Sequence, residues 1–248
     1  LKEEPHMMIP GGLKEGGTSF EGHGFFEASS MRKVGEKYYF VYSSKLSHEL
    51  CYAVSDYPDR EFTFGGTLIS NGDIGYEGNQ EPHNMMGNNH GGMVKANGQW
   101  YIFYHRQTHG TESSRQGCAE KITIQEDGSI KQVEMTSCGL NKGGLSDKGT
   151  YPAAIACNLM GKDSIGKITY GASLKDTQPY IFEENNDLHY IANIGDGVVV
   201  GYKYFAVEKL SKVVLCLRGD AEGEIKVSAD LAGKSELGSS RFKLQGKE

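Results

Sequence analysis

The chain has 248 residues and a formal net charge of −6. Its length fits one large domain or two modest ones, and its 34 glycines and 14 tyrosines are typical of many short strands and tight turns. The negative charge, without any Lys/Arg cluster, argues against nucleic acid as a partner. A membrane is not expected either, since no stretch approaches the roughly 18 apolar residues of a membrane span.

The chain does not begin with methionine and shows no secretory signal sequence. We therefore expect its first residue to be a cut or processed end, which says nothing about targeting. Its five cysteines are an odd number without C-x-x-C spacing, so a zinc ribbon is not expected.

An internal repeat organises the first half of the chain. Residues 27–42 resemble residues 90–105 at a constant offset, so that Glu27 aligns with His90. Each copy predicts a strand, a glycine turn and an aromatic strand that alternates faces. Further strand-like runs follow in the two copies, at 50–54, 62–68, 118–124 and 130–135. About four strands per copy is the content of a propeller blade, so the sequence predicts an all-β fold.

Two blades do not complete a propeller, which typically has four to eight. We expect the other blades to be absent from this chain: either it is a fragment, or residues 1–20 are the tail of a blade whose earlier part has been removed. The innermost strand of each blade lines the central channel, and Glu27 and His90 begin that strand in successive blades. We therefore expect both side chains to point into one shared funnel, which indicates a functional site.

A hairpin is predicted where residues 121–124 and 130–133 alternate apolar and polar side chains around a Glu-Asp-Gly-Ser turn. Cys118 and Cys138 are equally far from Gly128 in this turn. We expect them either to form a disulfide at the open end of the hairpin or to be two unrelated buried thiols.

The composition turns to Gly, Ser, Asp and Lys at 139–149, which is typical of a linker or a long loop. We therefore divide the chain into a partial propeller, residues 1–145, and a second domain, residues 146–248. Short strand-like runs return in the second domain, at 153–159, 167–170, 180–182, 188–193, 197–205, 212–218 and 224–228. Regular short strands with turns between them predict an antiparallel β-sandwich.

Glu27 is the best candidate for a catalytic acid. Glycoside hydrolysis usually needs two carboxyl groups, of which one protonates the leaving oxygen and the other activates water or attacks the sugar. Phe25 and Phe26 precede Glu27, and we expect these aromatic neighbours to raise its pKa by desolvation, which suits a general acid. The alternative is a structural glutamate that is hydrogen-bonded to Ser29, Ser30 or nearby backbone.

His90 lies among glycines and asparagines in Gly-Asn-Asn-His-Gly-Gly, and glycines permit a close backbone approach to a ligand or ion. Zinc needs more His, Cys or carboxylate ligands than one histidine. A hydrated hard cation on the propeller axis could use one histidine and several waters. The alternative is an ordinary hydrogen-bonded histidine.

Other polar residues near the repeat are weaker candidates for sugar contacts. Arg106 follows the second aromatic strand and is expected either to orient a carboxylate or sugar hydroxyls, or to be a solvated rim residue. Ser44 holds the corresponding place in the first copy, while Glu81 and His83 lie in a polar loop that leads to His90. Loops are polar in any case. In the second domain, either sugar stacking or ordinary packing is expected of Tyr180, Tyr190, Tyr202 and Tyr204.

Two segments carry a resemblance to a known family. Residues 26–43, Phe-Glu-Ala-Ser-Ser-Met-Arg-Lys-x-Gly-x-x-Tyr-Tyr-Phe-x-Tyr-Ser, resemble the general-acid segment of family 43 glycoside hydrolases. Residues 87–93, Gly-Asn-Asn-His-Gly-Gly-Met, with the aromatic run at 98–105, look like the segment of that family that carries an axial metal histidine. The resemblance extends over residues 18 to roughly 140. It implies a five-bladed β-propeller and hydrolysis with inversion, as in β-xylosidases, α-L-arabinofuranosidases and arabinanases.

By this resemblance Glu27 is the general acid, His90 is associated with a calcium ion on the propeller axis, and Arg106 is a looser match to a substrate-contacting position. Residues 151–248 are similar to a family 6-type carbohydrate-binding β-sandwich. The family places its catalytic base and an acid-tuning residue, both aspartates, on earlier blades. We expect those blades to be absent here, so that this chain alone hydrolyses little or nothing.

The sequence therefore predicts the carboxy-terminal portion of an inverting glycosidase of the β-xylosidase/α-L-arabinofuranosidase type. Its expected substrates are arabinose- or xylose-containing plant polysaccharides or oligosaccharides, as in xylan degradation, and a secreted or cell-surface location is favoured over the cytoplasm. Two alternatives stay open. One is a non-catalytic glycan-binding propeller and sandwich, and the other is a structural propeller in which Glu27 and His90 fill the channel.

Overall fold

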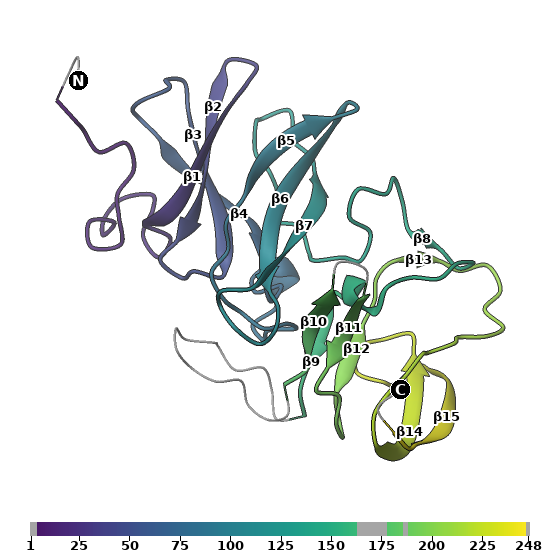
Figure 1. The fold of residues 1–248 in the computed structure, drawn as a ribbon. Helices are drawn as coiled ribbons and strands as arrows, with labels where there is room; N and C mark the ends of the chain where they lie inside the picture. Colours follow the sequence, from purple (N-terminus) through teal and green to yellow (C-terminus); the bar gives the residue numbers. More distant parts are fainter. Residues whose placement is uncertain (1–3, 163–177, 186–187, 247–248) are drawn as a thin grey trace. The chain divides into compact units, whose positions relative to one another are not determined.

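The computed structural model describes residues 4–162, 178–185 and 188–246 (Figure 1). Apart from two 3₁₀ turns, η1 (Tyr76–Gly78) and η2 (Ala153–Ile155), the regular elements of this part are β-strands. The described residues include no helix with the length and apolar character that a membrane crossing needs. The predicted all-β fold is therefore confirmed.

The first copy of the repeat forms a four-stranded antiparallel sheet, as predicted. Its strands, in sheet order, are β1 (Phe25–Val34), β2 (Lys37–Ser44), β3 (Glu49–Ser55) and β4 (Thr63–Ser70). Gly35, with a φ of 58°, makes the turn between β1 and β2. Side chains alternate along β2, because Tyr39 and Val41 pack in one apolar cluster while Phe40 and Tyr42 pack in another.

The second copy forms a sheet of three strands, β5 (Gly92–Ala96), β6 (Gln99–Gln107) and β7 (Arg115–Ile122). Residues 130–135, predicted as its fourth strand, do not form one. The Val133 amide instead donates to the carbonyl of Leu68 in β4 (2.9 Å), and Ile130 and Met135 are buried in a core shared with the first sheet. The segment leaves its own sheet because its apolar side chains are buried against the neighbouring one.

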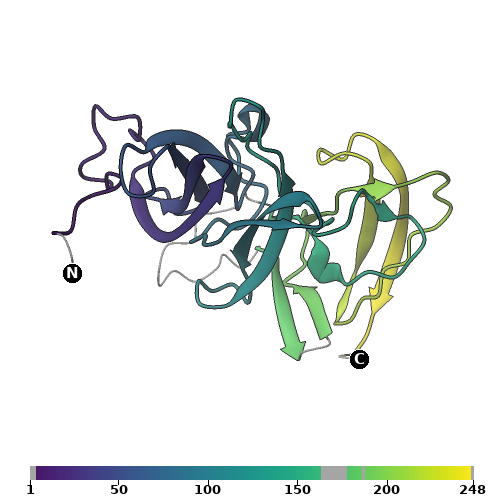
Figure 2. The same cartoon turned by 90° about the horizontal axis from the view of Figure 1, so that it is seen from above.

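The two sheets lie side by side and share this core (Figures 1 and 2). Its fully buried members include Tyr39, Val41, Leu50, Tyr52, Leu68, Ile69, Met93, Ile102 and Ile122. Burial of one such side chain contributes about 1.5–3 kcal/mol. The core therefore holds the beginnings of β1 and β5 in a fixed relation, and Glu27 and His90 lie at those beginnings.

The chain divides into units at a different place from the predicted boundary. One unit comprises Leu1–Leu145 with Gly149–Phe205, and the other comprises Ser146–Lys148 with Ala206–Glu248. The described residues of Gly149–Phe205 form backbone hydrogen bonds with the earlier part of the first unit. The Leu159 amide donates to the His83 carbonyl (2.9 Å), and the His109 amide donates to the Ile181 carbonyl (2.7 Å).

The later strands form pairs. In the first unit, β9 (Asn158–Met160) pairs with β12 (Val199–Gly201), and β10 (Tyr180–Asn185) pairs with β11 (Leu188–Ala192). The two-residue strands β8 (Leu145–Ser146) and β13 (Phe205–Ala206) also pair. In the second unit, β14 (Ala221–Ser228) and β15 (Glu236–Leu244) form an antiparallel hairpin.

The structure shows these strands as separate two-stranded sheets, so the β-sandwich stays a prediction. The predicted run at 212–218 is not a strand, and the one at 167–170 lies outside the described residues. Several apolar side chains of the second unit are exposed, namely Val207, Leu210, Val213, Val214, Leu215 and Leu217.

All five cysteines are free. The hairpin predicted around Gly128 forms only at its tip, where Ile124 and Ile130 make an isolated bridge, because the chain then crosses to β4. The sulfur of Cys138 accepts a hydrogen bond from the Tyr204 amide (3.3 Å). The disulfide with Cys118 is therefore wrong, and the alternative of two separate thiols is the one observed.

Candidate functional site

A β-bulge positions Glu27. The pairing of β1 with β2 shifts register on both sides of Glu27, between Phe25 and Glu27 and between Glu27 and Ser30, and Ala28 has a positive φ of 61°. A bulge turns a side chain out of the regular alternation of the strand and is common beside active sites. The side chain of Glu27 is 37% exposed, so its carboxyl group is accessible to a ligand.

His90 lies opposite Glu27, just before β5. A Cβ atom on the next residue, Gly91, would come within 1.8 Å of the Phe103 carbonyl oxygen. Glycine is therefore required here by the close approach of β6, rather than by a ligand. His90 Nε2 lies 2.8 Å from Glu27 Oε1, and Asn88 Nδ2 donates to the same oxygen (2.5 Å). The equivalent residues of the two repeats are thus in direct contact, and the shared funnel into which both were expected to point stays a prediction.

The pKa of Glu27 is lowered, first by its hydrogen bond with His90 and then by the one from Asn88. These bonds stabilise the ionised carboxylate. Desolvation acts in the opposite direction but is the smaller effect, and Phe26 itself is 57% exposed. The expectation that aromatic neighbours raise this pKa is therefore wrong.

His105 and Arg115 complete the polar cluster around Glu27, and sequence reasoning did not assign either to the site. His105 Nε2 accepts a hydrogen bond from the His90 amide (3.1 Å) and lies 3.3 Å from Arg115 Nη1. Burial, followed by the positive charge of Arg115, lowers the pKa of His105 to about 4. His105 is therefore neutral at pH 7, which suits its role as an acceptor. The charge of Arg115 also favours the ionised form of Glu27.

Arg106 lies away from this cluster. It is buried, and its guanidinium donates to the carbonyl of Ala156, to that of Ala154 (2.7 Å) and to Gln116 Oε1 (2.9 Å). It alternates with His105 along β6, so the two side chains are on opposite faces of the strand. Arg106 thus holds the η2 turn against the second sheet, whereas the exposed arginine beside Glu27 is Arg115.

Ser44 and His83 also lie outside the polar cluster around Glu27. Ser44 is fully buried and donates to Glu49 Oε1 (2.6 Å). His83 lines a separate pocket of about 360 Å³, where its Nδ1 is 3.9 Å from Asp73 Oδ2. That carboxylate also pairs with Lys203 Nζ (3.3 Å). The structure therefore brings together Glu27 and His90 but neither Ser44 nor His83 with them.

The surroundings of His90 offer part of a calcium site. Calcium takes six to eight oxygen ligands. Glu27 supplies a carboxylate, and Asn88 Oδ1 is buried without a hydrogen-bond partner, whereas His90 supplies only nitrogen. Within the described residues, the cluster of three metal-binding side chains is formed by His23, Glu49 and Cys51 instead.

No family model matches this chain. A xylosidase/arabinosidase from Thermoclostridium stercorarium is 46% identical over 240 residues, which cover 94% of this chain and 51% of that protein. A β-xylosidase from Xylanibacter ruminicola is 42% identical over 84 residues, or 34% of this chain and 22% of that protein. The chain therefore spans about half the length, or less, of the curated relatives that it matches.

Solved structures give likenesses over part of the chain. A family 43 β-xylosidase/α-arabinofuranosidase from a compost microbial metagenome, in complex with xylotriose and in a calcium-free form, is 31% identical with a TM-score of 0.37. The likeness covers 44% of this chain and 30% of that enzyme. The relatives and structural neighbours of this chain are therefore xylosidases and arabinosidases, and the solved ones include family 43 glycoside hydrolases.

Proposed function

We propose that this chain is part of an inverting glycoside hydrolase that acts on arabinose- or xylose-containing plant polysaccharides or their oligosaccharides. The observation that carries the proposal is the accessible Glu27 carboxyl group, held by His90 and Asn88 where the two repeats meet. The names of the relatives support this substrate class. Polymeric substrates of this kind favour a secreted or cell-surface location.

Glu27 is the proposed general acid, which protonates the leaving glycosidic oxygen. An inverting enzyme also needs a second carboxylate that activates water on the opposite face of the sugar. We propose that this base comes from outside the 248 residues, and that the chain alone hydrolyses little. A carboxylate brought close to Glu27 raises its pKa by like-charge repulsion. That effect opposes the lowering by His90 and Asn88 and brings Glu27 toward the protonated form that an acid needs.

Arg115, and not Arg106 as expected from the sequence, is the proposed substrate-binding arginine. Its guanidinium is exposed and lies within hydrogen-bonding distance of His105 Nε2. The same nitrogen accepts the hydrogen bond from the His90 amide. A guanidinium in this position can donate to two neighbouring sugar hydroxyls at once. The neutral His105 holds both His90 and Arg115, so we assign it a positioning role.

Calcium near His90 and a carbohydrate-binding role for residues 146–248 are further parts of this proposal. If calcium binds, the carboxylate of Glu27 and the free Oδ1 of Asn88 are the oxygen donors that the described residues offer there. Its chemistry would be electrostatic, namely support for negative charge beneath the sugar.

Glycan binding without hydrolysis is the second candidate function. The lowered pKa of Glu27 favours it, because an ionised carboxylate accepts hydrogen bonds from sugar hydroxyls but has no proton to donate. In that case Glu27, Arg115 and His90 form a recognition site.

The test is hydrolysis of an aryl α-L-arabinofuranoside and an aryl β-D-xyloside. Three proteins are compared: this chain, the longest product of the gene that encodes it, and the Glu27→Gln variant of the active form. Hydrolysis by the wild type that Glu27→Gln abolishes supports the glycosidase. Saturable binding of arabinoxylan without release of reducing sugar supports the second candidate and contradicts the first.

A further inference from the structure

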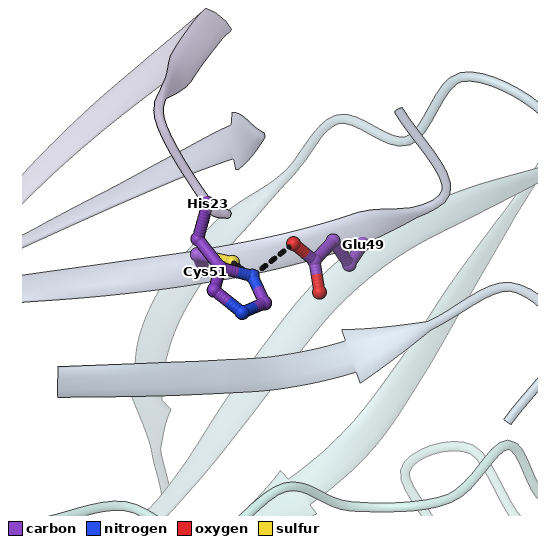
Figure 3. Close-up of side chains that lie close together, drawn as sticks. All are labelled: His23, Glu49 and Cys51. Atoms are coloured by element: carbon purple, nitrogen blue, oxygen red, sulfur yellow. Dashed lines mark hydrogen bonds and ion pairs between the residues drawn. The ribbon is translucent and has the colours of Figure 1, made fainter. Parts of the chain in front are cut away.

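A second polar cluster lies on the first sheet and has no part in the proposed function. His23 comes just before β1, and Glu49 and Cys51 are two residues apart on β3, so they share one face of that strand. Figure 3 shows the three side chains converging. Their ligand atoms all lie within 4.8 Å of one another. The His23 Nδ1 atom is 2.7 Å from Glu49 Oε1 and 4.0 Å from Cys51 Sγ.

Neighbouring side chains hold these groups in place. Ser44 donates to Glu49 Oε1 (2.6 Å), and Thr67 donates to Glu49 Oε2 (2.9 Å). The His23 ring stacks on Phe64, with 4.7 Å between the ring centroids. Such outer contacts orient ligands in metal sites and restrict their motion.

We propose that His23, Glu49 and Cys51 bind a zinc ion, with water as the fourth ligand. Zinc takes imidazole nitrogen, thiolate sulfur and carboxylate oxygen in tetrahedral geometry at bond lengths of about 2.0–2.3 Å. Neighbouring ligand atoms in such a site are roughly 3.5 Å apart. The His23–Glu49 and His23–Cys51 separations, 2.7 and 4.0 Å, lie on either side of that value, and all three ligand atoms lie within 4.8 Å of one another.

The charges of the three side chains and their exposure are also compatible with a zinc ion. Cys51 is fully buried and the Glu49 side chain is 5% exposed. A thiolate and a carboxylate together balance the two positive charges of zinc, so an occupied site buries no net charge. The His23 side chain is 33% exposed, so the cluster reaches the surface of the protein at this residue.

The bound ion would join the segment before β1 to β3. Glu27 is four residues after His23, so the site would fix the beginning of the strand that carries it. The role assigned here is structural, and it stands whether or not the chain belongs to an active glycosidase.

The experiment uses the 248-residue chain after removal of metals with a chelator, with Co²⁺ as a spectroscopic substitute for zinc. We expect one cobalt per chain with a thiolate-to-cobalt absorption band, and displacement of the cobalt by zinc. Cys51→Ser should abolish the band. Cys216→Ser, which removes the exposed cysteine of the other unit, should leave it unchanged. The absence of the band from the wild type, or its persistence in Cys51→Ser, would overturn the proposal.

A second variant separates metal binding from folding. Cys51 is buried, so its replacement can lower stability by itself. His23→Gln is milder, because the partly exposed glutamine amide can still donate to Glu49. We expect it to keep the fold by circular dichroism but to weaken zinc binding by about tenfold or more. We also expect zinc to raise the Tm of the wild type and not that of His23→Gln. Equal zinc affinity in a folded His23→Gln would contradict the proposal.

Discussion

Glu27 and His90 occupy equivalent positions in two successive repeats, and their side chains meet at 2.8 Å. The contact exists because each residue lies at or just before the beginning of the first strand of its sheet, and the shared core fixes the two sheets side by side. It also determines the charge of Glu27, since the hydrogen bond with His90 is the largest cause of its lowered pKa.

Replacement of Glu27 by glutamine should affect poor leaving groups more than good ones. A general acid contributes about 10²–10⁴-fold to rate, and a leaving group that needs no proton loses little when the acid is removed. The measurement is kcat/KM of the active form on a series of aryl glycosides with increasing leaving-group pKa. Equal losses along the series would contradict the acid role.

Replacement of His90 by alanine should raise the pKa of Glu27 toward its ordinary value of 4.5. The variant loses the hydrogen bond that most favours the carboxylate and keeps the one from Asn88. The measurement is an NMR titration of the Glu27 carboxyl carbon, with His83→Ala as the control because His83 lines a different pocket. An unchanged titration in His90→Ala would show that the contact does not govern the charge of Glu27.

The two arginines of β6 and β7 should respond differently to alanine. Arg106→Ala leaves the carbonyls of Ala154 and Ala156 without their donor, and we expect a loss of about 3 kcal/mol in the free energy of unfolding. Arg115→Ala removes an exposed side chain and should cost less than about 0.5 kcal/mol, while it weakens binding of xylo-oligosaccharide. Urea denaturation and calorimetric titration measure these effects. A stable Arg106→Ala with weakened sugar binding would reverse the assignment.

Glu120 should make the fold less stable as the pH rises. Burial raises its pKa from 4.5 to about 7, although Thr136 donates to both carboxyl oxygens (2.7 Å each). The folded state therefore binds the proton more tightly than the unfolded state. Between about pH 4.5 and 7 the free energy of unfolding should fall by up to about 3 kcal/mol and then level off.

Glu120→Gln should lack this pH dependence, because glutamine imitates the protonated carboxyl group. The measurement is urea denaturation at pH 5 and pH 8, and the variant should be more stable than the wild type only at pH 8. Glu126→Gln, in the exposed turn nearby, is the control and should follow the wild type at both values. A wild-type stability that does not fall between pH 5 and 8 would refute the prediction.

The pairing of Glu27 with His90 could be predicted because a constant repeat offset puts both residues at the same strand position. The sequence alone could also have predicted that Arg106 lies away from Glu27 and His90. Ile102 and Tyr104 are apolar core residues, and the two-residue period of a strand puts Arg106 on their face rather than on that of His105. Arg115 was harder to find, because the strand that carries it begins before the apolar run at 118–124.

Other features depend on contacts that a local pattern does not contain. The lowered pKa of Glu27 depends in part on a hydrogen bond from Asn88, which is distant in sequence. The loss of the Cys118–Cys138 hairpin follows from the burial of Ile130 and Met135 beside the other sheet. Short alternating runs do not reveal which of two neighbouring sheets they join.

The crossing of Val133 to Leu68 makes the two repeats interdependent. A repeat that closes its own sheet can be removed or duplicated as a module, as in arrays whose units contact only their neighbours. Here the end of the second copy bonds to the edge of the first, so neither copy has a complete set of backbone partners without the other. The boundary between the repeats in the sequence is therefore not a boundary at which the protein can be cut, and both copies should unfold in a single transition.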